Sequence, residues 1–129
     1  MRLLLDTRVV IWFSTDPKKL PLKVFNAILD PANVVLLSHF CILEMEIKVQ
    51  IGKLNLTKSI DRIIVEQLQV NGMRELPQTL DHIRGLRQLP LIHRDPFDRL
   101  LISQANHEQA LFVTDDRLIS QYSVPIFWK

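Results

Sequence analysis

The sequence is poor in the features that mark secreted, membrane and multidomain proteins. It has one cysteine, Cys41, and three glycines among 129 residues. A single cysteine cannot form an internal disulfide, so we expect a protein of the reducing cytoplasm. No apolar run approaches the roughly 18 residues that a membrane-spanning helix needs. Asp6 and Arg8 interrupt the apolar N-terminal stretch and no small-residue cleavage site follows it, so we expect no signal peptide.

Linkers, repeats and a strong charge of either sign are also missing. No Gly/Ser-rich linker or internal repeat divides the chain, so we predict a single domain over residues 1–129. The 16 Lys and Arg residues against 14 Asp and Glu give a net charge of +2, which is too weak to imply nucleic-acid binding alone. Apolar residues make up 47% and charged residues 23%, which is typical of a globular protein with a sizeable core.

Five short apolar segments alternate with segments of helical periodicity. We predict strands over residues 2–6, 33–38, 73–77, 110–116 and 124–128. We predict helices over 20–31, 39–52 with Gly52 as the C-terminal cap, 57–68 with Thr57 as the N-terminal cap, 79–89 and from 98 onward. The clearest strands are apolar throughout, as in sheets buried between two layers of helices. The alternation therefore predicts an α/β fold with a parallel sheet and helices on both sides.

Isolated acids stand at the ends of the predicted strands or at the starts of neighbouring helices. They are Asp6, Glu44, Asp95, Asp98, Asp115 and Asp116. In an open parallel sheet, ligands bind beyond the carboxyl ends of the strands, so four separate segments can deliver carboxylates to one edge. Such a cluster repels itself unless a cation neutralises it. Oxygen ligands suit Mg²⁺ or Mn²⁺ better than zinc, so the acids indicate a site for one of these ions.

Each acid by itself also has a structural explanation. Asp6 can simply end a strand, and Glu44 has the spacing to Lys48 of a helical ion pair worth about 0.3 kcal/mol. The acids that precede helices can serve as ordinary N-terminal acids. Glu46 lies about 200° around the helix from Glu44, and periodicity does not decide which of the two faces inward. The four histidines have no spacing that suggests a zinc site. It is the joint placement of the acids that favours a functional site.

Four stretches of the sequence resemble one known family. They are "LLLDTRVVIWF", "LSHFCILEMEIKVQIGKL", "LPLIHRDPFDRLLISQA" and "LFVTDDRLISQYSVPIFW". Their order and spacing resemble those of PIN-domain proteins, and above all the small bacterial PIN proteins grouped with VapC-type toxins of toxin–antitoxin pairs. The resemblance spans nearly the whole chain. Its most specific parts are "HRDPFDRLLI" and the T-x-D step after the fourth predicted strand.

This resemblance implies a three-layer α/β/α fold with a five-stranded parallel sheet and an acidic pocket that binds Mg²⁺ or Mn²⁺. It implies a metal-dependent endoribonuclease, often a homodimer, that a cognate antitoxin neutralises. The implied catalytic and metal-binding acids are Asp6, Glu44, Asp98 and Asp116. The implied supporting residues are Thr7, Thr114, Asp95 and Asp115. The chain departs from the family pattern at three positions that are not ligand positions, namely Arg8, Cys41 and Leu43.

Contacts with RNA and with an antitoxin have candidate residues of their own. The arginines that crowd the segment around the "DPFD" loop can bind RNA phosphates, or they can be solvated or face acids of an antitoxin. They are Arg84, Arg87, Arg94 and Arg99. A set of apolar residues can form part of an antitoxin groove where it is exposed, or cover the core where it is not. It comprises Ile60, Ile63, Ile64, Val65 and Leu68.

Two other classes of function stand beside the nuclease. A phosphoryl-accepting receiver needs an acid pair at the first strand and an acceptor Asp after the third, but the first strand supplies only Asp6 and the third ends at Leu76-Pro77. A D-x-D phosphatase motif is absent because Arg8 occupies the second acid position. The remaining alternative is a PIN-fold binding module with weak or no catalysis that acts through protein or RNA partners. Metal binding without RNA cleavage would favour that alternative.

Overall fold

Five short strands pair in parallel to form one sheet with the order β3-β2-β1-β4-β5. A computed structural model describes all residues from 1 to 129. The strands are β1 (Arg2–Leu5), β2 (Val34–Ser38), β3 (Arg74–Leu76), β4 (Leu111–Val113) and β5 (Ile126–Phe127). All five predicted strands are confirmed, and each is shorter than its predicted segment. The register pairs Leu4 of β1 with Leu36 of β2 on one side and with Phe112 of β4 on the other.

Helices connect every strand to the next except for the last connection, which holds only a short turn. The α-helices are α1 (Thr7–Thr15), α2 (Leu22–Leu29), α3 (His39–Gln50), α4 (Ile60–Val65), α5 (Leu80–Arg84) and α6 (Pro96–His107). The shorter turns are η1 (Pro17–Lys19), the π-helical η2 (Glu66–Val70), η3 (Gly85–Gln88) and η4 (Ile119–Gln121). Helices α2 to α6 correspond to the predicted helices. Helix α1 was not predicted, because the β-branched run after Asp6 resembles a continuation of the first strand.

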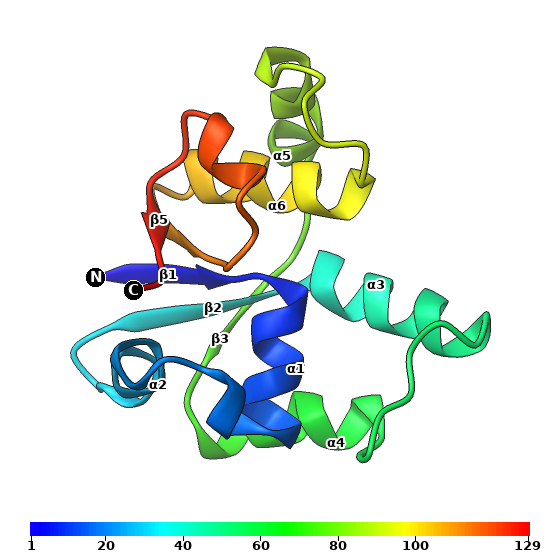
Figure 1. Cartoon of the computed structure of the whole chain (residues 1–129), viewed down its shortest axis with the longest axis vertical. Coiled ribbons are helices and arrows are strands. Elements are labelled where there is room, and N and C mark those ends of the chain that lie inside the picture. Colours follow the sequence, from blue (N-terminus) through cyan, green and yellow to red (C-terminus); the bar gives the residue numbers. More distant parts are fainter.

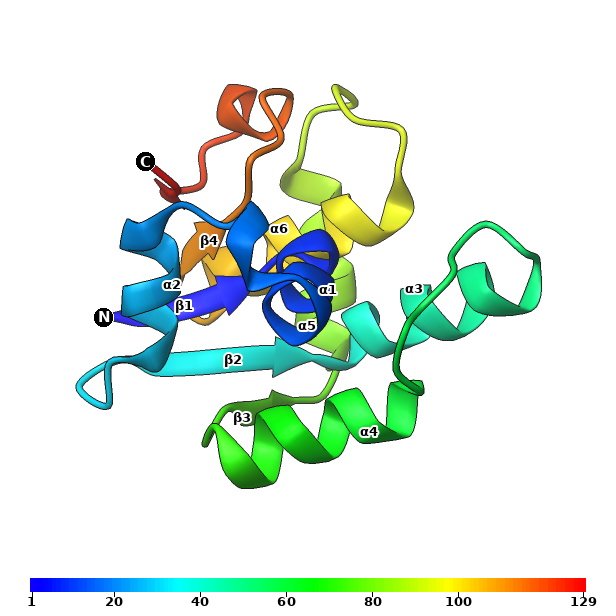
Figure 2. The same cartoon turned by 60° about the horizontal axis from the view of Figure 1, so that its bottom comes forward.

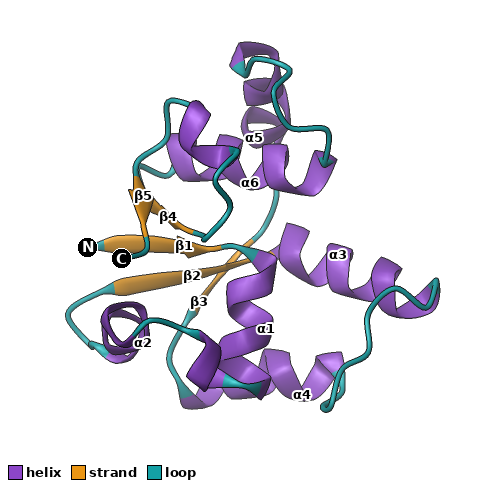
Figure 3. Ribbon diagram, viewed as in Figure 1, coloured by secondary structure: helices purple, strands orange, loops and turns teal.

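The helices form two layers with the sheet between them. Helices α1, α2 and α4 lie over one face and α5 and α6 over the other (Figures 1 and 2). In Figure 3, β1 and β2 run toward the side at which α1 and α3 begin. Right-handed crossovers account for this arrangement, because the chain changes face when it passes from β3 back across the sheet to β4. The predicted three-layer α/β/α architecture is confirmed, and the strand order reverses between β1 and β4.

The hydrophobic core is built on the central strands. Leu3, Leu4 and Leu5 of β1 are completely buried, as the middle strand of a sheet covered on both faces requires. Phe112 and Val113 of β4 are equally inaccessible. The continuous apolar runs in the sequence therefore correspond to the strands that carry helices on both faces.

Local caps determine where the helices around the sheet begin and end. Ser38, the last residue of β2, accepts a hydrogen bond from the backbone N–H of Phe40 and so starts α3 directly after the strand. Ser59, rather than the predicted Thr57, caps α4. Helix α3 ends just before Gly52, which has a φ of 75°, the left-handed conformation that glycine adopts without strain.

A buried polar network ties α5 to α6. The backbone N–H of Thr79 donates to Nδ1 of His82, so the ring carries its proton on Nε2, which donates to Oε2 of Glu108 at 3.0 Å. The hydroxyl of Ser103 donates to the backbone oxygen of His82. A Cβ at Gly85 would lie 2.2 Å from this hydroxyl oxygen, so the close approach of the two elements requires glycine there. We therefore interpret His82 as a structural residue.

The structure divides the apolar residues at 60–68 between the two explanations left open for them. Ile60 and Ile63 belong to the core, whereas Val65 is 48% exposed. A second set of exposed apolar side chains lies four residues apart and therefore along one face of α3. These side chains are Leu43, Ile47 and Ile51, with exposed fractions of 47%, 39% and 57%. None of the helices combines the length and the apolar character needed to cross a membrane.

Candidate functional site

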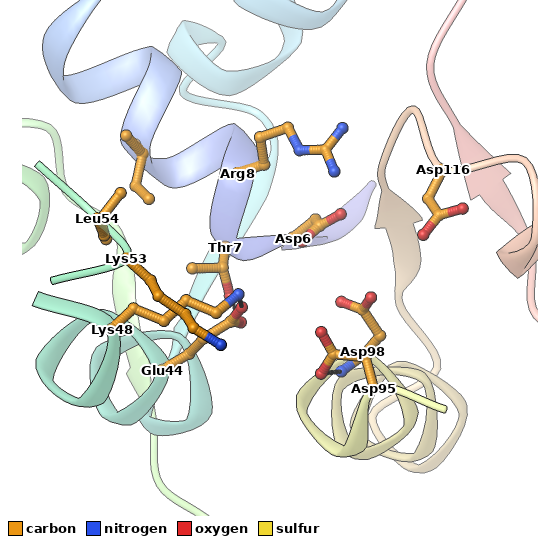
Figure 4. A pocket seen from close by; sticks show the side chains of 11 residues that line it. Asp6, Thr7, Arg8, Glu44, Lys48, Lys53, Leu54, Asp95, Asp98 and Asp116 are labelled. Carbon is orange, nitrogen blue, oxygen red and sulfur yellow. Dashed lines mark hydrogen bonds and ion pairs between the residues drawn. The ribbon is translucent and has the colours of Figure 1, made fainter. Parts of the chain in front are cut away.

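An acidic pocket lies beyond the carboxyl ends of β1 and β4, where the strand order reverses. The cavity has a volume of about 220 Å³, and its lining is mostly charged (Figure 4). The predicted site residues that line it are Asp6, Thr7, Glu44, Asp95, Asp98 and Asp116. The other lining residues are Arg8, Ile11, Lys48, Lys53 and Leu54. The fold thus brings together all four acids that the resemblance implied as ligands.

Asp6 lies at the centre of the pocket, directly after β1. Its backbone N–H donates to the backbone oxygen of Val113 at 3.0 Å, which holds the residue beside the end of β4. Its Oδ2 accepts a hydrogen bond of 2.7 Å from the hydroxyl of Thr114, the supporting role predicted for that residue. The side chain is almost completely buried, and this burial raises the pKa of Asp6 to about 6 despite the hydrogen bond from Thr114.

Glu44 faces the pocket from the middle of α3. It is 5% exposed, whereas Glu46 points to solvent, which decides the choice that periodicity left open. The hydroxyl of Thr7 donates to Oε1 of Glu44 at 2.6 Å, and Nζ of Lys48 lies 2.5 Å from Oε2. The ion pair with Lys48 and the position in the pocket are therefore both present, so the two explanations of Glu44 are not alternatives.

Asp98 and Asp95 reach the pocket from the beginning of α6. Asp95 is the N-terminal cap of the helix, because its Oδ1 accepts hydrogen bonds from the backbone N–H groups of Phe97 and Asp98. Asp98 lies in the first helical turn rather than before the helix. Burial, and then the negative charges of Asp6 and Asp95, raise the pKa of Asp98 to about 7. The negative charges of the pocket acids therefore repel one another, and a bound cation would offset this repulsion.

Asp116 lines the pocket on the side of β4, and His93 lies beside it outside the lining. The backbone N–H of Asp116 donates to the Thr114 hydroxyl at 3.1 Å, and Oδ1 of Asp116 accepts from the backbone of Leu118. Nε2 of His93 lies 2.9 Å from Oδ2 of Asp116 and 3.1 Å from Oδ2 of Asp98. Sequence reasoning missed His93 because its spacing to other histidines carried no signal. Its position two residues before Asp95, in the same loop, was the one available indication.

The three departures from the family pattern have simple structural consequences. Arg8 pairs with Asp115 across the pocket rim, with 3.2 Å between Nη1 and Oδ1, so Asp115 does not line the cavity. Cys41 is completely buried, and its thiol donates to the backbone oxygen of Leu5. Leu43 belongs to the exposed stripe of α3. None of these side chains replaces one of the pocket acids.

Two lysines give the pocket a positive wall opposite three of its acids. Figure 4 shows Lys48 and Lys53 beside Glu44, whereas Asp98 and Asp116 lie across the cavity. The hydrogen bond to Glu44 contributes most to the raised pKa of Lys48, so this side chain stays charged. An anionic substrate can therefore approach the acids along the lysine side.

The four predicted RNA-contacting arginines lie outside the acidic pocket. Arg84 and Arg87 line a separate polar hollow of about 730 Å³ between α5, η3 and α6, and Arg94 is exposed in the loop before α6. Arg99 is half-buried, and its guanidinium donates to the backbone oxygens of Leu86 and Leu89. Three of these arginines are thus accessible to a ligand, while Arg99 holds η3 against α6.

The chemistry of the pocket fits a hard divalent cation. Its donors are carboxylate oxygens from four segments, which are the ligands that Mg²⁺ and Mn²⁺ prefer. Burial contributes most to the raised pKa values of Asp6 and Asp98, and the charges of neighbouring acids add to it, so a bound cation would offset both effects. His93 is the one histidine beside the pocket acids, and its Nδ1 accepts a hydrogen bond from the backbone N–H of Asp95.

Comparisons with known proteins agree with this architecture. A sequence model of the family described as PIN domain matches residues 3–125. The chain is similar to VapBC2 from Rickettsia felis, solved bound to a DNA fragment from its promoter, with a TM-score of 0.73, 16% identity and complete coverage of both chains. It is similar to VapBC-1 from nontypeable Haemophilus influenzae, with a TM-score of 0.60, 16% identity and coverage of 100% and 97%. A domain from Methanocaldococcus jannaschii follows with a TM-score of 0.58, 14% identity and coverage of 99% and 90%. Comparison with curated protein sequences finds no match.

Proposed function

The chain belongs to the PIN domain family, and from this premise we propose that it is a metal-dependent endoribonuclease of the VapC-like toxin type. The observation that carries the proposal is the convergence of Asp6, Glu44, Asp98 and Asp116 from four segments on one pocket at the point where the strand order reverses. Such a site suits hydrolysis of phosphodiester bonds, because the leaving and attacking oxygens both need charge stabilisation.

The four acids would hold one or two Mg²⁺ or Mn²⁺ ions. The hydroxyls of Thr7 and Thr114 orient two of these acids. The ions would supply activation of water and neutralisation of charge on the phosphate. Thr114 orients Asp6 through its Oδ2, and Thr7 orients Glu44 through its Oε1. Oriented ligands matter because hydrogen bonds to metal-binding carboxylates tune the affinity of the site.

The lysines give the pocket the positive charge that a substrate phosphate needs. A carboxylate cluster repels the backbone of RNA, so a phosphate needs positive charge on its way to the site. Lys48 and Lys53 lie on one wall of the pocket and can bind a phosphate oxygen once metal neutralises the acids. We propose this role for them in addition to the ion pair between Lys48 and Glu44.

The decisive experiment is cleavage of labelled RNAs by the purified, antitoxin-free protein with Mg²⁺, with Mn²⁺ and with EDTA. Glu44→Gln and Glu46→Gln form a matched pair, because both remove one charge from α3 but only Glu44 faces the pocket. We expect cleavage to need metal, to disappear in Glu44→Gln, Asp6→Asn and Asp98→Asn, and to persist in Glu46→Gln. Equal cleavage by the folded Glu44→Gln variant would contradict the proposal. Metal binding without cleavage of any RNA would favour the binding-module alternative.

We also propose that RNA phosphates contact Arg84 and Arg87 in the hollow between α5 and α6. Both side chains are exposed, and Asp81 is the only acid that lines the hollow. Replacing both arginines by glutamine should weaken RNA binding and flatten its dependence on salt. With fewer phosphate contacts, fewer counterions are released when RNA binds, and their number sets the salt dependence. An unchanged salt slope in a filter-binding assay would contradict this part of the proposal.

The antitoxin is the proposed protein partner, since the similar structures from Rickettsia felis and Haemophilus influenzae are VapBC proteins. The exposed stripe of α3 offers an apolar surface for it, with Ile47 at the centre. We expect Ile47→Glu to prevent co-purification with the cognate antitoxin. Val70→Glu, at an even more exposed apolar residue of η2, should not. Retention of the antitoxin by Ile47→Glu would exclude this surface. The homodimer stays a prediction, which light scattering of the same samples tests.

A further inference from the structure

His93 occupies a special position between two of the pocket acids. Its Nε2 lies 2.9 Å from Oδ2 of Asp116 and 3.1 Å from Oδ2 of Asp98, and its side chain is 14% exposed. Asp98 comes from α6 and Asp116 from the loop after β4, so one ring connects two elements of the site. No sequence spacing indicated this contact, because the fold alone brings Asp116 beside the loop that carries His93.

Two hydrogen bonds hold His93 in place independently of these acids. Its backbone N–H donates to the hydroxyl of Tyr122 at 2.7 Å, and Tyr122 is 5% exposed. The backbone N–H of Asp95 donates to Nδ1 of the ring at 3.1 Å. Asp95 is itself fixed as the cap of α6. The ring is thus anchored to the loop and to the beginning of the helix before it touches either pocket acid.

These contacts decide which atom of His93 carries the proton. An imidazole nitrogen that accepts a hydrogen bond has no proton, so Nδ1 is unprotonated and Nε2 carries the N–H. A protonated Nε2 cannot bind a metal ion. Its N–H group donates to Oδ2 of Asp116, and Oδ2 of Asp98 lies 3.1 Å from the same nitrogen. The same logic applies to His82, whose Nδ1 accepts from Thr79. The nearness of His93 to two acids is therefore not evidence of a nitrogen ligand.

We propose that His93 is a positioning residue whose Nε2–H group donates to Oδ2 of Asp116 and holds Oδ2 of Asp98 by a close electrostatic contact, which leaves Oδ1 of Asp98 free for a cation. Asp116 needs less help, because its Oδ1 already accepts from the backbone of Leu118. The Asp98 carboxylate accepts no hydrogen bond, so its contact with Nε2 of His93 is the one polar contact that orients it. This inference rests on the proposed metal site and adds the residue that aligns two of its ligands.

The test measures Mn²⁺ affinity by calorimetry rather than RNA cleavage, with variants first shown to be folded by circular dichroism. We expect His93→Ala to weaken Mn²⁺ binding by about 10- to 100-fold, which is typical when a ligand loses its hydrogen-bonding partner. His93→Gln, whose amide can donate from a similar position, should retain much of the affinity. His39→Ala is the matched control, because His39 pairs with Glu75 of β3 and neither residue lines the pocket.

Each outcome distinguishes this inference from the proposed function. Mn²⁺ binding by the wild type that is unchanged in His93→Ala would overturn the positioning role and leave the metal site intact. Absence of Mn²⁺ binding by the wild type would overturn the proposed site and this role together. Nitrogen-15 spectra of the imidazole should show the Nε2–H tautomer before and after addition of Mg²⁺. A change to the Nδ1–H tautomer on adding Mg²⁺ would make His93 a ligand and contradict the inference.

Discussion

Replacing Asp98 by Asn should stabilise the metal-free protein at alkaline pH. The pKa of Asp98 is raised from the ordinary value of 3.8 to about 7, first by burial and then by the charges of Asp6 and Asp95. The folded state therefore binds this proton more tightly than the unfolded state does. Its stability must fall as pH rises from about 4 to about 7, because ionisation then costs more in the folded protein.

The size of the effect follows from the same values. At about 1.4 kcal/mol per pKa unit, a rise from 3.8 to about 7 corresponds to an upper limit of about 4 kcal/mol. Solvent reaches the rim of the pocket and screens the charge, so we expect about 1–2 kcal/mol. The Asn side chain keeps an oxygen that can accept from Nε2 of His93, so the substitution removes the charge with little change of shape.

Urea unfolding in EDTA measures this difference directly. Asp98→Asn should be more stable than the wild type at pH 8, and the difference should shrink toward zero near pH 3, below the ordinary pKa of 3.8, where Asp98 is mostly protonated in both states. Asp61→Asn, which removes an exposed acid from α4, is the control for general charge effects. Saturating Mg²⁺ at pH 8 should reverse the order by stabilising only the wild type. An Asp98→Asn variant that is no more stable than the wild type in EDTA at pH 8 would refute the electrostatic reasoning.

Three further predictions concern the pocket and the packing behind it. Lys48→Met should lower the urea unfolding midpoint in EDTA at pH 8, because Glu44 then stays buried without its cation. Mg²⁺ should reduce the difference between the midpoints of the variant and the wild type. Equal midpoints of the two proteins in EDTA would show that Lys48 does not stabilise Glu44. Mg²⁺ should raise the thermal unfolding midpoint of the wild type in a saturable manner but leave the midpoint of Asp6→Asn unchanged. Equal rises in the two proteins would show that the ion binds outside this pocket. Gly85→Ala should lower the free energy of unfolding by about 1–3 kcal/mol, because the new Cβ meets the Ser103 hydroxyl. In a double-mutant cycle with Ser103→Ala, the effects of the two substitutions should not add, and additive effects would contradict this contact.

The sheet was predictable because its strands carry their own signal. Segments such as "RLLLD" and "ALFVTDD" are apolar throughout and end in carboxylates, which is the pattern of strands buried on both faces. Parallel strands share one carboxyl edge, so the acids that follow them had to lie near one another. The same local reasoning missed α1, because the β-branched run after Asp6 resembles a continuation of the first strand. In the structure Asp6 directly precedes α1, and its carboxylate accepts a hydrogen bond from Thr114 in the pocket.

The alternation of strands and helices and the acids at the sheet edge could be predicted from the sequence, because strands buried on both faces and the residues that end them leave local patterns. That Glu44 rather than Glu46 faces inward depends on how α3 packs, so it is visible only in three dimensions. The same holds for the contacts of His93 with Asp98 and Asp116. These contacts link residues up to 108 positions apart, as between Asp6 and Thr114, and no local pattern encodes distances that arise when separate elements pack together.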